Sequence, residues 1–97
     1  MELIKTWEFR INKNTDDSSQ KYPDLPFSMA LQAGENTYSA NVTFNIVNQN
    51  LQITIYDDSD NIIQPRINVG SNIDLFFIIG YSLIYNDDLS RFEFYKD

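Results

Sequence analysis

The sequence predicts an all-β domain, either an antiparallel sandwich or a small closed barrel of six or seven strands. Apolar and polar residues alternate with a period of two in several segments, as in strands that bury one face. Polar turns separate these segments at intervals of roughly 10 to 15 residues. The chain has 97 residues, 42% of them hydrophobic, which suffices for one modest core. We therefore expect a single β domain over residues 1–97.

The first strand is expected at about residues 3–11. Apolar residues occupy its odd-numbered positions and are interrupted only by Lys5. Residues 12–21 are all polar and cannot contribute to a core, which predicts a surface loop.

The next two strands follow a segment with two prolines, residues 22–27, whose fixed φ angles favour extended backbone. Residues 27–31 alternate between apolar and small or polar side chains. A turn at 34–36 leads to residues 38–46, which have the clearest strand pattern in the chain.

A second hairpin is expected at residues 48–50, because asparagine tolerates the positive φ of tight turns. The strand over 51–55 follows, and a turn at 57–61 leads to a short strand over 62–69. Pro65 places that strand on a sheet edge or at a bend. Four residues of the two central strands are expected to point inward: Val42, Phe44, Ile53 and Ile55.

The last third of the chain begins with residues 73–79, which are apolar without a clear period. We expect a short turn or 3₁₀ piece at about 72–76 and then a strand. Residues 86–88 predict the last turn, and 91–95 predict the final strand.

Composition excludes several function classes. Fourteen acidic against seven basic residues give a net charge of −7, which disfavours nucleic acid as a partner. The chain has neither histidine nor cysteine, the usual general base, metal ligands and thiol nucleophile, so we expect no enzyme, cofactor or metal site. The first residues lack the apolar core of a signal peptide. The sequence contains no run of 18 apolar residues, so we expect no membrane-spanning helix.

Two groups of neighbouring carboxylates resemble metal sites in their spacing. Asp57, Asp58 and Asp60 are spaced like calcium ligands, but the glycine and glutamate of an EF-hand loop are missing, which favours a turn capped by its own aspartates. Asp87 and Asp88 are interpreted in the same way.

Glu8 and Glu93 are the single candidate pair of carboxylates for sugar hydrolysis, because they would lie on neighbouring strands if the two terminal strands pair. Their outward positions favour charge pairs with Arg10 and Arg91 instead.

The aromatic content is more than a small core can fully bury: seven Phe, six Tyr and one Trp. These rings either form interfaces with other subunits or fill the ends of a barrel. The residues expected at an interface are Tyr22, Pro23, Phe27, Leu75, Phe76, Phe77 and Tyr81.

The order of hydrophobic and turn positions between residues 27 and 80 is FSMAL (27–31), NTY (36–38), FN (44–45), LQITIYD (51–57), II (62–63), RINVG (66–70) and IDLF (73–76). This order resembles the small plug proteins at the centre of the baseplate of contractile phage tails and phage-tail-like bacteriocins. The strand with Trp7 and the residues after Gly80 lie outside the resemblance.

The resemblance implies a structural protein of the virion or tail-like particle, assembled in the bacterial cytoplasm. Its partners would be the baseplate hub, spike and tail-tube proteins, with several copies around the tail axis. The alternative function is a carbohydrate-binding β-sandwich module, in which an exposed Trp7 or tyrosine ring would stack on a sugar.

Overall fold

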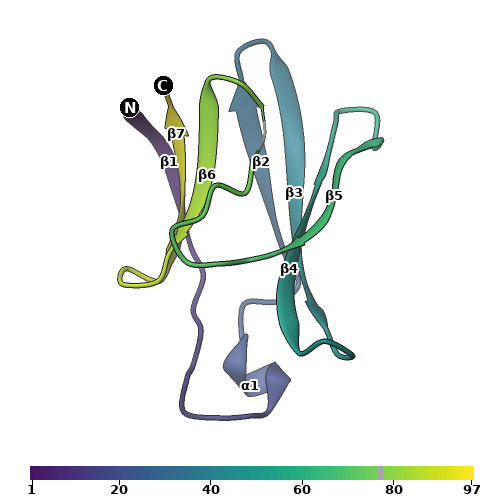
Figure 1. The fold of residues 1–97 in the computed structure, drawn as a ribbon, viewed down its shortest axis with the longest axis vertical. Coiled ribbons are helices and arrows are strands. Elements are labelled where there is room, and N and C mark those ends of the chain that lie inside the picture. Colours follow the sequence, from purple (N-terminus) through teal and green to yellow (C-terminus); the bar gives the residue numbers. More distant parts are fainter. Residues whose placement is uncertain (77) are drawn as a thin grey trace.

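Two antiparallel sheets pack face to face in the computed structural model, which describes residues 1–76 and 78–97 (Figure 1). The elements in chain order are β1 (Glu2–Glu8), α1 (Ser18–Lys21), β2 (Phe27–Ala33), β3 (Asn36–Asn45), β4 (Asn50–Tyr56), β5 (Ile62–Asn68), β6 (Tyr81–Asn86) and β7 (Arg91–Lys96). One sheet has the order β1-β7-β6 and the other β2-β3-β4-β5. The antiparallel sandwich is therefore confirmed, and the sheets do not close into a barrel.

The four-stranded sheet follows the alternation of the sequence. β2 pairs with β3 without a bulge, from Phe27 opposite Val42 to Ala33 opposite Asn36. Val42, Ile53 and Ile55 are buried as expected, whereas Phe44 is only half-buried. β5 lies on the sheet edge, where Pro65 was expected, and its pairing with β4 is irregular.

The three-stranded sheet brings the termini together, because β1 pairs with β7 from Glu2 opposite Lys96 to Glu8 opposite Arg91 (Figure 1). The expected start of the first strand is confirmed to within one residue, but the inward position of Leu3 and the end of the strand at residue 11 are wrong. A register shift after Leu3 leaves that side chain 43% exposed. At the other end β1 stops at Glu8, and beyond it the backbone N–H of Arg10 donates to Asp24 instead of continuing the sheet.

The segment before β6 corrects another expectation. Asn72 lies in a turn, as one of the two alternatives expected, but no 3₁₀ piece forms at 72–76 and the strand begins only at Tyr81. Leu75 and Phe76, expected at an interface, are both 0% exposed. Their burial follows from the backbone, because the N–H of Leu75 donates to the carbonyl of Leu83 at 2.7 Å and holds the segment against β6. Phe77 lies outside the described residues.

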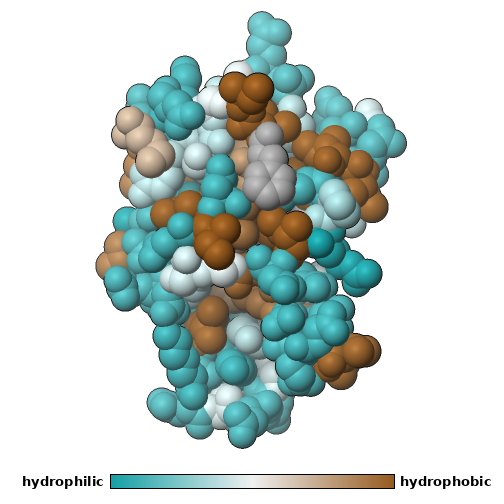
Figure 2. All heavy atoms as spheres, viewed as in Figure 1, coloured by the Kyte–Doolittle hydropathy of each residue, from teal (hydrophilic) through white to brown (hydrophobic). Residues whose placement is uncertain are grey.

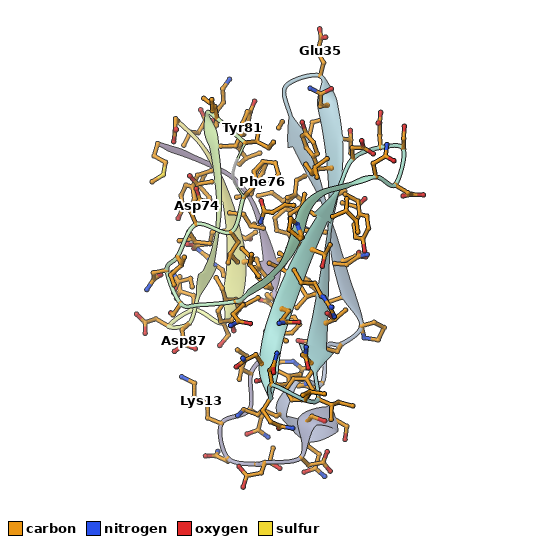
Figure 3. The ribbon with its side chains drawn as sticks, turned by 45° about the vertical axis from the view of Figure 1, so that its right-hand side comes forward. Lys13, Glu35, Asp74, Phe76, Tyr81 and Asp87 are labelled. Carbon is orange, nitrogen blue, oxygen red and sulfur yellow. The ribbon has the colours of Figure 1, made fainter. Side chains whose placement is uncertain are left out.

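The core is largely aromatic. The ring of Phe76 lies between the sheets (Figure 3), 5.4 Å from the ring of Tyr38 and 5.7 Å from that of Phe94. A second cluster joins Phe9, Tyr85 and Phe92, with ring centroids 5.0 to 6.2 Å apart. Much of the aromatic content is thus accounted for by the core of this chain.

Replacing Phe76 should test this packing. Phe76→Ala is expected to lower the free energy of unfolding by about 3–5 kcal/mol, because it leaves a cavity between the sheets. Ile79→Ala, three residues along the same segment and 97% exposed, should change it by less than about 0.5 kcal/mol. Urea unfolding of both variants measures the difference, and equal small losses would contradict the position of Phe76.

Candidate functional site

Residues of α1, of the segment after it and of β3 line a groove. Figure 1 shows α1 at one end of the molecule. Its first hollow, of about 380 Å³, is lined by Ser18, Ser19, Tyr22, Pro23, Leu25, Pro26, Val42, Thr43 and Phe44. A second hollow, of about 310 Å³, shares three of these residues and is lined by Pro26, Phe27, Ser28, Asn41, Val42 and Thr43. The two hollows together are called the α1 groove below.

The expected surface loop over 12–21 contains the short helix α1, which forms one wall of the groove. Asp17 caps the helix by accepting a hydrogen bond from the backbone N–H of Ser19 at 3.0 Å. These bonds to Ser19 lower the pKa of Asp17. At the other end of the segment, the N–H of Asn12 donates to the carbonyl of Lys21 at 2.8 Å. The loop is thereby closed on itself.

A salt bridge joins the segment that follows α1 to the residues that follow β1. The Arg10 guanidinium contacts the Asp24 carboxylate at 2.8 Å, and the Arg10 backbone N–H donates to the same carboxylate at 2.8 Å. These hydrogen bonds lower the pKa of Asp24. Asp24 therefore stays ionised at neutral pH and holds residues 22–26 close to the end of β1.

Tyr22 and Phe44 form the apolar floor of the groove. Their rings lie 5.2 Å apart at 39°, and Tyr22 is only 8% exposed. Among the described residues, the rest of the lining includes serine, threonine and asparagine side chains and no charged group. Such a surface suits an apolar side chain of another protein, with hydrogen bonds around it.

The structure separates the residues that the sequence grouped as an interface. Tyr22, Pro23 and Phe27 all line the α1 groove. Tyr81 lies elsewhere, half-buried, with its ring stacked 5.6 Å from that of Phe94. The interface role of the groove residues stays a prediction, while Leu75 belongs to the core.

Several groove residues were missed by the sequence analysis. The sequence predicts that Phe44 points into the core and that Ser18 and Ser19 belong to a surface loop. Thr43 was assigned to an outer strand face with no further role, although it lines both hollows. The Asp17-Ser18-Ser19 run is a helix-capping signal that could have located α1.

A second apolar surface lies toward the other end of the molecule. Ile62 and Ile63 of β5 are 60% and 39% exposed, and Ile73 and Ile79 are 59% and 97% exposed. Ile63 and the half-buried Ile78 line one hollow, which has Asp57 and Asp58 at its rim. Figure 2 shows apolar side chains gathered on the upper half of this face. These five residues, Ile62, Ile63, Ile73, Ile78 and Ile79, form what we call the isoleucine patch.

The aspartate clusters have local structural roles. Asp57 accepts hydrogen bonds from the backbone N–H groups of Ser59 and Asn61, each at 2.9 Å, and these bonds lower its pKa. Asp87 forms a salt bridge of 2.7 Å with Lys13 (Figure 3). Over residues 1–76 and 78–97, the structure contains no cluster of three or more side chains arranged to hold a metal ion.

Glu8 and Glu93 do lie on paired strands, but their surroundings differ. Glu93 is 3% exposed on the outer face of β7, where Arg91 contacts it at 2.7 Å and the Tyr95 hydroxyl donates to it at 2.8 Å. Burial alone would raise the pKa of Glu93, but the bonds from Arg91, Tyr95 and Asn86 outweigh burial and lower it. A general acid needs the opposite shift.

Trp7 does not present a free ring. It is half-buried against the core, and the Lys5 ammonium lies 5.1 Å from its ring centre. The carbohydrate-binding alternative expected an exposed Trp7 or tyrosine ring, and the arrangement of Trp7 gives it no support.

Comparisons with protein-family models, with curated proteins and with solved structures found no match. In the part of the chain that the structure describes, no helix has the length and apolar character to cross a bilayer.

Lowering the pH should remove the stability that the ionised Glu93 side chain contributes to the folded state. Because its pKa is lowered by folding, the resulting stability is present above the unfolded value of about 4.3 and is lost as the pH falls through the folded value. Glu93→Gln should lower the free energy of unfolding by about 1–3 kcal/mol at pH 7, and this loss should narrow at pH 3. Glu8→Gln, at an exposed position on β1, is the control and should have little effect. Urea unfolding at both pH values tests this, and an undiminished loss at pH 3 would contradict the assignment.

Proposed function

We propose that the chain is a structural component of a phage or phage-tail-like contractile baseplate, a plug-type protein that docks on the central hub and the tail tube. The observation that supports this most is that two separate surfaces expose apolar side chains suited to docking, the α1 groove and the isoleucine patch. A protein that connects two neighbours needs two such surfaces. The order of positions over residues 27–80 supports the particular family.

The two surfaces differ in the partner that they would accept. The α1 groove is uncharged, so it suits an inserted apolar side chain. The isoleucine patch has Asp57 and Asp58 at its rim, so it suits an apolar surface flanked by basic residues. With a net charge of −7, the chain would also be attracted over long range to basic surfaces of hub, spike or tube proteins.

Exposed isoleucines agree with a protein that works inside an assembly. Ile79 is 97% exposed, and Val47 on the β3–β4 turn is 90% exposed. Single exposed apolar residues are ordinary, but apolar side chains that line one hollow, as Ile63 and Ile78 do, are typical of a surface that another subunit covers. Several copies around the tail axis would each use both surfaces.

Particle incorporation tests the proposal. In cells that produce the contractile particle but lack the native gene, we expect the wild-type chain to enter purified particles. Thr43→Arg, which fills the groove, and Ile79→Asp, which charges the patch, should each reduce its amount by at least about tenfold, equivalent to 1.4 kcal/mol of lost binding.

Ser39→Arg is the matched control, because Ser39 is exposed on the same face of β3 as Thr43 and lines neither hollow. Circular dichroism must show that all three variants fold. Absence of the wild-type chain from the particles would overturn the baseplate function. Unchanged incorporation of both variants would show that the docking surfaces lie elsewhere.

A further inference from the structure

The outer edge of β2 has no backbone partner in the described structure. β2 ends its sheet, and over residues 1–76 and 78–97 its backbone hydrogen bonds are those of the ladder with β3. In an antiparallel edge strand, every second residue turns its N–H and C=O groups away from the sheet. Seven consecutive residues, FSMALQA, form this edge without a charge, a proline or a bulge.

The other three sheet edges are protected. β6 is covered by the segment before it, since Asn72 and Leu75 donate backbone N–H groups to the carbonyls of Tyr85 and Leu83. β5 contains Pro65 and has irregular pairing. β1 contains Glu2, Lys5 and Glu8 and a register shift. Charges, proline, bulges and covering segments are the usual devices against edge pairing, and β2 has none of them within residues 1–76 and 78–97.

We propose that β2 pairs antiparallel with β2 of a second copy of this chain, about a twofold axis at Ala30. Ala30 then lies opposite itself, Met29 opposite Leu31, and Ser28 opposite Gln32 of the second copy. Because antiparallel partners share a face, the buried side chains of both copies stay on the inner face. The two four-stranded sheets become one continuous sheet.

The side chains of β2 fit this pairing with itself. Those on the outer face, Ser28, Ala30 and Gln32, are exposed, small or uncharged. No like charges meet across the axis, although each copy has a net charge of −7. The remaining repulsion is long-range and is screened by salt, so added salt should strengthen the dimer. The proposal does not depend on the baseplate function.

The register gives a charge-swap test on the full chain. Ser28→Lys with Gln32→Lys places like charges opposite each other twice in the dimer. Ser28→Lys with Gln32→Glu places opposite charges there, with the same residues replaced. We expect the wild type to dimerise below about 0.5 mM in sedimentation velocity, and the Kd of the Lys/Lys variant to exceed that of the Lys/Glu variant by at least about tenfold.

Hydrogen exchange locates the interface independently. The backbone amides of residues 27–33 should become more protected as the wild-type concentration rises, and those of β5 should not. A monomer at all concentrations overturns the proposal, even if β2 is protected within a particle, because the edge would then bind a strand of another protein. A dimer with equal Kd for both variants overturns the register and the axis at Ala30. If the chain forms this dimer but never enters a tail particle, the result supports the β2 dimer and overturns the proposed baseplate function.

Discussion

The two sheets are joined along one side by the segment that ends in Leu75 and Phe76. Asp74 fixes its backbone, because one carboxylate oxygen accepts from the N–H of Phe76 at 3.0 Å and from that of Leu83 at 3.1 Å. The carbonyl of Leu75 accepts a hydrogen bond from the buried Gln64 side chain of β5. The segment thus contacts β6 in one sheet and β5 in the other. The same few residues hydrogen-bond to the backbone edge of β6 and pack Phe76 against the aromatic rings between the sheets.

Strands with one buried face could be predicted from sequence, because alternation determines which residues face the core. β2 and β3 follow their patterns closely, whereas β4 buries Gln52 and Thr54 on its other face as well as the expected Leu51, Ile53 and Ile55. Residues 73–79 could not be placed, since a segment that bonds along a strand edge has no fixed period. Leu3 was expected to point inward, but the register shift between Leu3 and Lys5 reverses the faces of the residues before it, Glu2 and Leu3, and nothing local in the sequence signals the shift. At residues 48–50 the hairpin was predicted, but the positive φ of 55° belongs to Gln49, not to an asparagine.

The candidate site was predictable only in part, because it is built from segments far apart in the sequence. The Pro-flanked aromatic residues Tyr22, Pro23 and Phe27 indicated one wall of the α1 groove. The other wall is the end of β3, and Phe44 is at once a strand residue and a groove residue. Alternation predicts that such a residue points inward, but it does not predict whether the sandwich extends far enough to cover it. Phe44 lies beyond the covered region and meets Tyr22 instead.

The α1 groove and the free edge of β2 are not independent surfaces. Ser28 and Phe27 line the second hollow of the groove and also begin β2. With an antiparallel second copy centred on Ala30, the end of its β2 and the following turn lie beside this hollow. A partner that occupies the groove as far as Ser28 therefore competes with the second copy, whereas one confined to the hollow beside Tyr22 does not. Because coupling between two binding events is reciprocal, the same geometry governs how dimerisation changes docking and how docking changes dimerisation.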